Sequence, residues 1–174
     1  MKTIYLLRHA KSEWDKPFKS DHERPLSKRG RKNAKALREF LEERIKEIDM
    51  AYISDSQRTT ETFEILTKNN RIVWNKKFTD KVYEANLNEL MDLIKSTDDE
   101  YNSIIIVGHN PGLESLANYL IMRHNTFADF SFFEKFSTCA FLCLRFSIDH
   151  WADVTDVQGK LGLYWLPIKE EKKD

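Results

Sequence analysis

The strongest constraint on the fold of this sequence is an alternation of short apolar runs with longer segments of helical periodicity. Ile4–Leu7, Met50–Ile53 and Ser103–Val107 are aliphatic and partly β-branched, as is typical of buried strands. Each of these runs is followed by a segment in which apolar residues recur at helical spacing. This alternation favours an α/β fold with a largely parallel sheet.

The remaining elements follow from caps, breakers and periodicity. We expect one helix from the cap Ser27 to about Glu47 and a second one after the cap Ser56. A third, short helix is marked by Leu87, Leu90, Met91 and Ile94. A fourth begins at Asn110 as cap, with Pro111 in its first turn, and extends to about Arg123. Further strands are expected at Ile72–Trp74, 138–146 and 161–166.

Length and composition exclude several classes of protein. The chain has 174 residues, 41% of them hydrophobic, and two cysteines, so neither a disulfide scaffold nor general disorder is expected. No apolar run approaches the ~20 residues that span a bilayer, and the first residues are too polar for a signal peptide. We therefore expect one domain over residues 1–174, with 169–174 as a frayed tail, in a soluble cytoplasmic protein.

The charge is balanced overall but unevenly distributed. The chain has 28 Lys and Arg against 28 Asp and Glu, yet eight cations and two anions lie between Lys16 and Lys35. Three interpretations of this basic segment remain open at this point: a nucleic-acid surface, a face for a phosphorylated or acidic partner, and a solvated helix face.

Three of the predicted strands end in residues that could act on a phosphoryl group. Arg8 and His9 follow the strand that ends at Leu7. His109 and Asn110 come shortly after the strand that ends at Val107, and Arg58 lies shortly after the strand that ends at Ile53. The carboxyl ends of parallel strands form the ligand crevice of open α/β sheets. The guanidinium group of arginine can bind two phosphate oxygens at once. A histidine whose imidazole is kept neutral by nearby cations can attack phosphorus. This chemistry needs no metal, because the arginines balance the charge.

These segments resemble a known family. The similar residues are Leu-Leu-Arg8-His9-Ala-Lys-Ser-x-Trp14, Arg24-Pro-Leu-Ser-x-Arg-Gly30, Ser54-x-x-x-Arg58-x-x-x-Thr62 and Val-Gly-His109-Asn-Pro-Gly-Leu-Glu. Together they resemble the histidine phosphatase superfamily, which is phosphoglycerate mutase-like in fold, and within it the small phosphohistidine phosphatases of the SixA type. The resemblance covers the whole chain, since Lys135-Phe-Ser-Thr138, Trp151 and the segment 161–169 also match elements of the small members.

The resemblance implies a three-layer α/β/α sandwich with a mixed, mostly parallel central sheet and no large insertion domain. It implies that His9 is the phosphorylated nucleophile, with Arg8, Arg58 and His109 completing the catalytic phosphate pocket. Glu84 is the candidate proton donor, although SixA-type members vary at this point. The expected substrate-binding residues are Arg8, Arg58, His109, Asn110, Ser12 and Thr138. No cofactor and no metal is expected, and inorganic phosphate or a similar anion should bind in the pocket.

Two departures from the family pattern matter for the site. The family often has Ser-Pro-Ala before the second arginine, whereas this chain has Ser54-Asp55-Ser56. A carboxylate facing a phosphate would weaken its binding, so we expect Asp55 to point outward or to pair with Arg58. The chain also lacks the long insertion with which larger members enclose a small substrate. This indicates that the entrance to the phosphate site is open.

Other conspicuous residues have simpler interpretations. His22, His124 and His150 match no motif and are expected to be structural or solvated. Cys139-Ala-Phe-Leu-Cys-Leu-Arg145 fits the Cys-x5-Arg pattern of cysteine-dependent phosphatases, but it lacks the glycines of a phosphate loop and is typical of a strand with two core thiols. Five phenylalanines in 127–136 are either core under a loop or a wall of the substrate or partner surface.

The function predicted from the sequence is a metal-independent phosphatase with a phosphohistidine intermediate, acting on phosphohistidine in a protein. Arg24 and Lys28–Lys35 are expected to help dock that protein. The alternatives are a small-molecule phosphomonoesterase of the same superfamily and a non-catalytic module that binds phosphate or a phosphoprotein. The expected partner is thus a phosphorylated protein or a small phosphate substrate, with no nucleic acid and no membrane.

Overall fold

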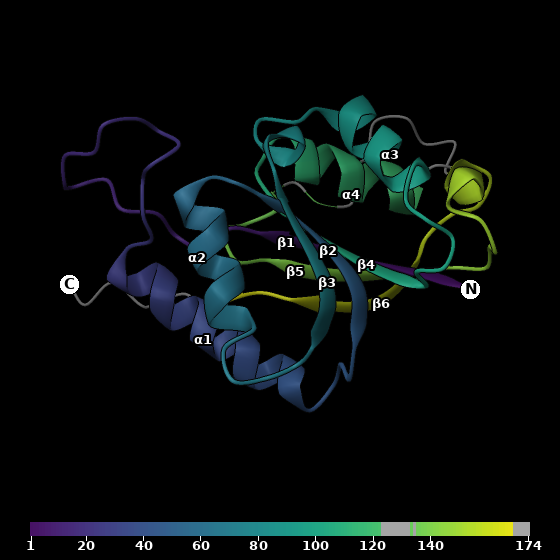
Figure 1. The fold of residues 1–174 in the computed structure, drawn as a ribbon, viewed down its shortest axis with the longest axis horizontal. Coiled ribbons are helices and arrows are strands. Elements are labelled where there is room, and N and C mark those ends of the chain that lie inside the picture. Colours follow the sequence, from purple (N-terminus) through teal and green to yellow (C-terminus); the bar gives the residue numbers. More distant parts are fainter. Residues whose placement is uncertain (123–132, 134, 169–174) are drawn as a thin grey trace.

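Six strands form one mixed sheet at the centre of the computed structural model, which describes residues 1–122, 133 and 135–168 (Figure 1). Their order across the sheet is β3-β2-β4-β1-β5-β6. The first four of these are parallel, and β5 and β6 run antiparallel to their neighbours. The strands are β1 (Lys2–Arg8), β2 (Ile48–Ser54), β3 (Val73–Thr79), β4 (Ser103–Gly108), β5 (Phe141–Phe146) and β6 (Lys160–Trp165).

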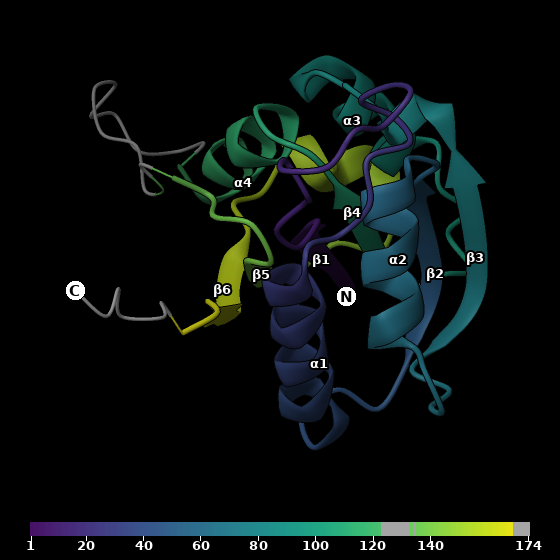
Figure 2. The same ribbon diagram turned by 90° about the vertical axis from the view of Figure 1, so that its left-hand side faces the viewer.

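Helices cover both faces of this sheet. One face packs against α1 (Lys28–Glu42) and α2 (Gln57–Leu66), and the other against α3 (Leu87–Lys95) and α4 (Gly112–Met122) (Figures 1 and 2). Two 3₁₀ helices, η1 (Asp80–Val82) and η2 (Trp151–Thr155), complete the described elements. The predicted three-layer α/β/α sandwich with a mixed, mostly parallel sheet is therefore confirmed, and the described residues contain no large insertion domain.

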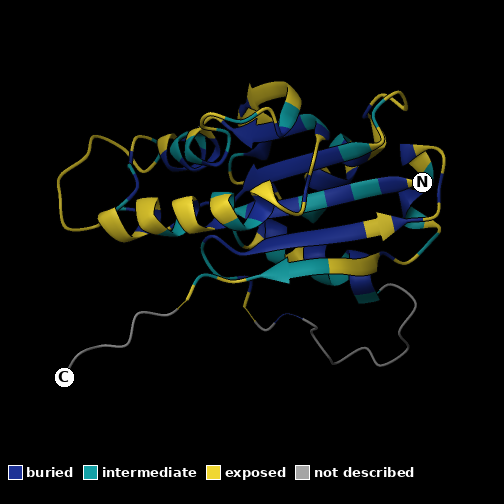
Figure 3. Ribbon diagram, turned by 90° about the horizontal axis from the view of Figure 1, so that it is seen from below, coloured by how far each residue is buried: buried dark blue, intermediate teal, exposed yellow. Residues whose placement is uncertain are grey.

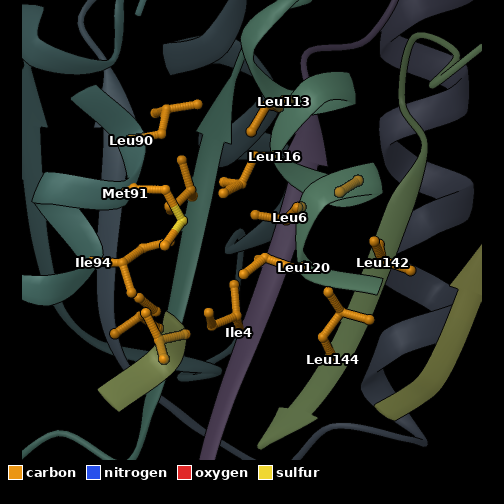
Figure 4. Packing of buried hydrophobic residues seen from close by; sticks show 14 of the residues in the cluster. Ile4, Leu6, Leu90, Met91, Ile94, Leu113, Leu116, Leu120, Leu142 and Leu144 are labelled. Atoms are coloured by element: carbon orange, nitrogen blue, oxygen red, sulfur yellow. The ribbon is translucent and has the colours of Figure 1, made fainter. Parts of the chain in front are cut away.

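The two faces of the sheet carry separate hydrophobic cores because side chains alternate along each strand. In β1, Ile4 and Leu6 pack with α3 and α4, while Leu7 packs with α1 and α2. Figure 4 shows Leu116 and Leu120 of α4 lying over the residues of β1. The central strands are almost entirely buried, whereas the outward side of α1 is exposed (Figure 3).

The boundaries of three elements differ from the prediction by about three residues or more. The helix α1 begins after its cap Ser27 as expected but ends at Glu42 rather than about Glu47. Ile45 and Ile48 are buried as their spacing indicated, but Ile45 lies in the turn after the helix and Ile48 begins β2. The strand β3 extends to Thr79, beyond the predicted Trp74. The strand β5 begins at Phe141, because Cys139 has a φ of 61°, which an extended strand excludes.

The two cysteines are core residues, as predicted. Cys139 and Cys143 are 0% and 4% exposed and belong to one hydrophobic cluster, although Cys139 precedes β5. Burial raises the pKa of the Cys139 thiol to about 12, so a thiolate nucleophile is disfavoured there.

The Phe-rich segment is described only in part. Phe133 and Phe136 are buried in the core that contains α3 and α4, which fits the core interpretation. Phe127, Phe130, Phe132 and His124 lie outside the described residues, as does the predicted tail 169–174. Within the described part of the chain, no helix has the length and apolarity needed to cross a bilayer.

Candidate active site

Two histidines lie side by side where β1 and β4 end. The two strands are parallel neighbours, and their register places Arg8 opposite Gly108. The next residues, His9 and His109, therefore leave the sheet at the same height, and their ring centroids are 5.2 Å apart. The two residues are 7% and 8% exposed. The sequence-based prediction that these strand ends converge is confirmed.

Two arginines join the histidines from neighbouring elements. Arg58 lies in the first turn of α2, just after β2, which is the other neighbour of β4. Its Nη2 donates a hydrogen bond to Nδ1 of His109 over 3.3 Å. Arg8, at the end of β1, donates from Nη1 to the carbonyl of Phe136 over 2.9 Å. Both guanidinium groups are close enough to His9 for their charge to lower its pKa. The structure thus brings together the four residues expected in the phosphate pocket.

The hydrogen bond of His9 determines which of its nitrogens is available. Its Nδ1 lies 2.7 Å from the carbonyl oxygen of Ala10, and the amide of Ala10 in turn donates to Oγ1 of Thr62 on α2 over 3.0 Å. A carbonyl only accepts, so Nδ1 bears the hydrogen and Nε2 keeps its lone pair. Burial lowers the pKa of His9 to about 3, and the charges of Arg58, Arg8 and Arg24 add to the effect. At neutral pH His9 is therefore an uncharged imidazole with a free lone pair on Nε2.

His109 is held in the opposite tautomer. Its Nδ1 accepts from Arg58, because a guanidinium group only donates, so the hydrogen lies on Nε2. That nitrogen is 2.7 Å from Oγ of Ser54, the last residue of β2. Burial lowers the pKa of His109 to about 3, helped by nearby His9 and by the charge of Arg58. His109 is thus neutral in this structure, and its N–H is engaged by Ser54.

Asp21 is the main site residue that sequence reasoning missed. Its Oδ2 accepts hydrogen bonds from Nη2 of Arg58 and from the hydroxyl of Tyr83, each over 3.0 Å, and its Oδ1 pairs with Arg24. Tyr83 also lies edge-on to His109, with ring centroids 5.4 Å apart. Partial burial alone would raise the pKa of Asp21, but the hydrogen bonds from Arg24 and Tyr83 and the charge of Arg58 lower it to about 2. Asp21 is therefore an anion that organises two arginines.

Two of the expected substrate-binding residues have their polar groups engaged elsewhere. The side-chain amide of Asn110 donates to Glu114 over 3.1 Å and to the carbonyl of Phe136 over 2.8 Å, which uses both of its hydrogens. Its Oδ1 is buried and has no hydrogen-bond partner in the described part of the chain, so it does not cap α4 as the sequence suggested. Ser12 is buried and accepts from Nη1 of Arg24 over 2.9 Å.

Thr138 and Glu84 form no side-chain hydrogen bond with the two histidines in the described part of the chain. Thr138 is half-buried and lines, together with Arg8, a separate pocket described below. Glu84 is exposed, directly after Tyr83, and has a φ of 53°. No hydrogen bond or ion pair joins Glu84 to the four phosphate-pocket residues within the described structure.

Asp55 and Arg24 settle two of the expectations raised by the sequence. Asp55 pairs with Nε2 of His22 over 2.9 Å and is partly exposed, whereas the described ion-pair partner of Arg58 is Asp21. Arg24 does not provide a surface cation, contrary to the docking role expected from the sequence. It is 6% exposed, and its guanidinium carbon lies 3.6 Å from the ring centroid of Trp14.

The described residues contain no group of three or more His, Cys, Asp and Glu side chains placed to hold a metal ion.

The family of the chain follows from comparison with known proteins. The family model "Histidine phosphatase superfamily (branch 1)" matches residues 4–101, more than half of the chain. The chain belongs to the histidine phosphatase superfamily. This membership identifies the enzyme class as phosphatase and confirms the resemblance drawn from the motifs. Among curated proteins, this phosphatase is 29% identical over 150 residues to an uncharacterized protein of Mycobacterium tuberculosis, covering 85% of this chain and 91% of that protein.

Solved structures share the fold of this phosphatase over almost its whole length. A SixA-named protein of Nakamurella multipartitia has a TM-score of 0.81 and 21% identity, covering 97% of both chains. The protein histidine phosphatase SixA complexed with tungstate has a TM-score of 0.74 and 16% identity over 93% of this chain and 95% of its own. A mycobacterial glucosyl-3-phosphoglycerate phosphatase, solved with VO3, has a TM-score of 0.67 and 14% identity, covering 97% of this chain and all of its own.

Proposed function

We propose that the protein is a metal-independent phosphatase that forms a phosphohistidine intermediate on His9 and acts on phosphohistidine in a protein. The observation that supports the nucleophile is the hydrogen bond from Nδ1 of His9 to the carbonyl of Ala10, which leaves the lone pair on Nε2. Surrounding cations favour an anionic phosphoryl group beside that nitrogen.

The first step transfers the phosphoryl group to the enzyme. The lone pair on Nε2 of His9 forms a bond to phosphorus, and the bond between phosphorus and the leaving nitrogen or oxygen breaks. The electron pair of that bond goes to the leaving group, which takes up a proton. Arg8 and Arg58 balance the charge on the equatorial phosphoryl oxygens through charge-assisted hydrogen bonds.

The second step returns the enzyme to its starting state. A water oxygen attacks phosphorus, the N–P bond breaks with its electrons returning to Nε2 of His9, and inorganic phosphate leaves after the water has lost a proton. A bound phosphoryl dianion favours protonation of His109, because it opposes the effect of the cations that lower the pKa of this residue. Protonated His109 bears a hydrogen on Nδ1 as well, which ends the bond that Nδ1 accepts from Arg58, and Nδ1 can then donate to a phosphoryl oxygen.

Two observations support a protein as substrate. Among the elements that the structure describes there is no inserted domain that would enclose a small molecule, and the fold matches SixA-named proteins over nearly their full length. A phosphoramidate also suits a site in which Glu84 forms no bond to the phosphate pocket, because a protonated imidazole leaves readily. A small-molecule phosphomonoesterase is the second candidate, because the glucosyl-3-phosphoglycerate phosphatase shares the fold.

The decisive experiment compares two substrates and three proteins in the presence of a chelator. A phosphohistidine peptide and an aryl phosphate are each given to wild type, His9→Ala and the control His150→Ala, whose exposed histidine pairs with Asp99. We expect chelator-resistant turnover of the peptide by wild type and His150→Ala but not by His9→Ala. Alkaline quenching of wild type with labelled substrate should trap label on the protein, and His9→Ala should trap none.

Each of the other outcomes would contradict a part of this proposal. A preference for the aryl phosphate would assign the enzyme to the small-molecule phosphatases. Loss of activity with chelator would contradict a metal-independent mechanism. Phosphate binding without turnover of either substrate would indicate a binding module.

A further inference from the structure

A basic pocket adjoins the catalytic arginine Arg8. It has a volume of about 310 Å³, and its described lining contains four cations and no acidic residue. The cations are Arg8, Lys11, Arg29 and Lys135. Arg8 therefore belongs both to the phosphate site, where it lowers the pKa of His9, and to this basic pocket.

The charges of this pocket are not balanced within the described structure. Arg31, on the same helix as Arg29, forms an ion pair with Glu61 over 3.0 Å. By contrast, Lys11, Arg29 and Lys135 form no ion pair with any described acidic residue, and all three are exposed. Four like charges around one cavity repel one another, and a bound anion would offset that repulsion.

The start of α1 adds to the positive potential. Acidic residues usually occupy the first turn of a helix, where they interact favourably with the helix dipole, but the first turn of α1 has none and contains Arg29. Asn33, one turn further along, also lines the pocket. The helix thus presents its positive end and a cation near the same cavity, a combination that is unfavourable without an anionic ligand.

The backbone holds Lys11 and Arg29 together. The carbonyl of Lys11 accepts hydrogen bonds from the amide and the hydroxyl of Ser27, over 2.9 and 3.0 Å. Gly30 packs so closely that a Cβ there would lie 2.1 Å from the same carbonyl oxygen. Arg8 in turn fixes the segment of Lys135 and Thr138, which also line the pocket, through its bond to the carbonyl of Phe136. The cavity is therefore built by contacts that do not depend on the exposed side chains of Lys11, Arg29 and Lys135.

We propose that this basic pocket binds an acidic side chain of the substrate protein, an Asp or Glu near the phosphorylated residue, while the phosphoryl group occupies the site at His9. The proposal rests on the proposed function, since it concerns the same protein substrate. Exposed lysines act as mobile point charges and accept carboxylates in varied geometries, which suits a peptide segment. Of the docking residues expected from the sequence, Arg24 and Lys28–Lys35, this pocket contains Arg29, and it adds Lys11 and Lys135.

The test uses two phosphohistidine peptides that differ only in flanking residues, Asp and Glu in one, Asn and Gln in the other. Wild type should show a KM about tenfold lower for the acidic peptide, which corresponds to about 1.4 kcal/mol. In the double variant Arg29→Gln, Lys135→Gln this ratio should fall below about twofold. The control variant Lys28→Gln, Lys35→Gln removes two exposed cations of α1 that do not line the pocket, and it should keep the wild-type ratio.

A second arm makes the pocket testable whatever the natural substrate. An acidic peptide without a phosphoryl group should competitively inhibit hydrolysis of an aryl phosphate by wild type, and it should do so at least about tenfold more strongly than its neutral counterpart. The Arg29→Gln, Lys135→Gln variant should lose that difference. Equal inhibition by the two peptides, or an unchanged difference in the variant, would overturn the pocket proposal. Failure to hydrolyse any phosphohistidine peptide would overturn only the proposed function.

Discussion

Asp21 holds Arg58 by both terminal nitrogens of its guanidinium group. Its carboxylate accepts from Nη2 over 3.0 Å, and its backbone carbonyl accepts from Nη1 over 2.7 Å. Since Nη2 also donates to His109, the loop before α1 fixes an arginine on α2, which in turn fixes the tautomer of a histidine after β4. Asp21 is thus placed to act as a positioning residue for the phosphate pocket.

The first prediction concerns Asp21→Asn. The variant keeps the backbone contact but loses the charge-assisted bond, so Arg58 should be less well oriented and kcat should fall about tenfold. Inorganic phosphate should inhibit the variant at least as well as wild type, because a negative charge has been removed beside the anion site. Steady-state kinetics with phosphate as inhibitor measure both quantities. The control Asp55→Asn removes a carboxylate that pairs with His22 and should change neither. Unchanged kcat, or a parallel loss of phosphate inhibition, would contradict a positioning role.

The second prediction concerns the acid sensitivity of the fold. The pKa values of His9 and His109 are lowered from 6.5 to about 3, mainly by burial, so the unfolded chain binds more protons than the folded one between these values. The free energy of unfolding should therefore fall as the pH drops below about 6.5, by up to ~1.4 kcal/mol per pH unit for each histidine. Denaturant unfolding of wild type and His9→Gln between about pH 7 and 5 measures the slope, which should be shallower in the variant.

His150→Gln is the matched control for this titration. His150 is exposed, and its bond to Asp99 raises its pKa, so any contribution it makes to stability is present below about 6.5 and lost as the pH rises through its folded pKa. Its removal should therefore not reduce the acid-induced loss of stability. An identical slope in wild type and His9→Gln would show that His9 does not remain neutral in the folded protein.

The cluster of two histidines and two arginines was predictable from sequence because its geometry follows from local rules. Each of Arg8, His9 and His109 stands directly at the end of a strongly apolar strand, and Arg58 stands in the first turn of the helix after another. Parallel pairing of neighbouring strands brings such ends together. Periodicity reports burial rather than conformation, however, which is why Ile45 and Ile48 extended the predicted α1 beyond Glu42.

Asp21, Tyr83 and Ser54 were not predictable in their roles by the same reasoning. Asp21 lies in a polar loop without periodicity, and its partner Arg58 is 37 residues away. Nothing local distinguishes it from Asp15 in the same loop. The role of Arg24 was wrongly predicted for a related reason. A cation in a basic segment is usually solvated, but the side chain of Arg24 is covered by its contacts with Trp14 and Asp21. Such contacts depend on how a loop folds over residues that are distant in the sequence, and hydrophobic periodicity does not predict this.

The third prediction follows from the burial of Arg24. Replacing it with Gln removes the stacking on Trp14 and the bonds to Ser12 and Asp21, so the free energy of unfolding should fall by roughly 1–3 kcal/mol. Because Asp21 then loses a partner, turnover of a phosphohistidine peptide and of an aryl phosphate should fall by similar factors. Denaturant unfolding and parallel assays of the two substrates measure these effects. A loss confined to the protein-like substrate, with stability unchanged, would restore the docking role for Arg24.

The last prediction tests Glu84 as the proton donor for ester substrates. An alkoxide leaving group needs a proton in the transition state, and a general acid contributes roughly 10²–10⁴-fold, whereas a protonated imidazole leaves without help. If Glu84 is this acid, Glu84→Gln should slow hydrolysis of an alkyl phosphate about 100-fold and that of a phosphohistidine peptide less than about threefold. The exposed Glu64 on α2 gives the control Glu64→Gln, which should affect neither substrate.

The backbone at Glu84 calls for a second variant. Its φ of 53° suits glycine, so Glu84→Gly removes the carboxyl group without adding strain to the loop. If Glu84 donates the proton, the Gln and Gly variants should show the same selective loss on the ester, because both lack the acid. If the two substrates slow together in Glu84→Gln and recover in Glu84→Gly, the residue acts only through the loop that places Tyr83 beside His109.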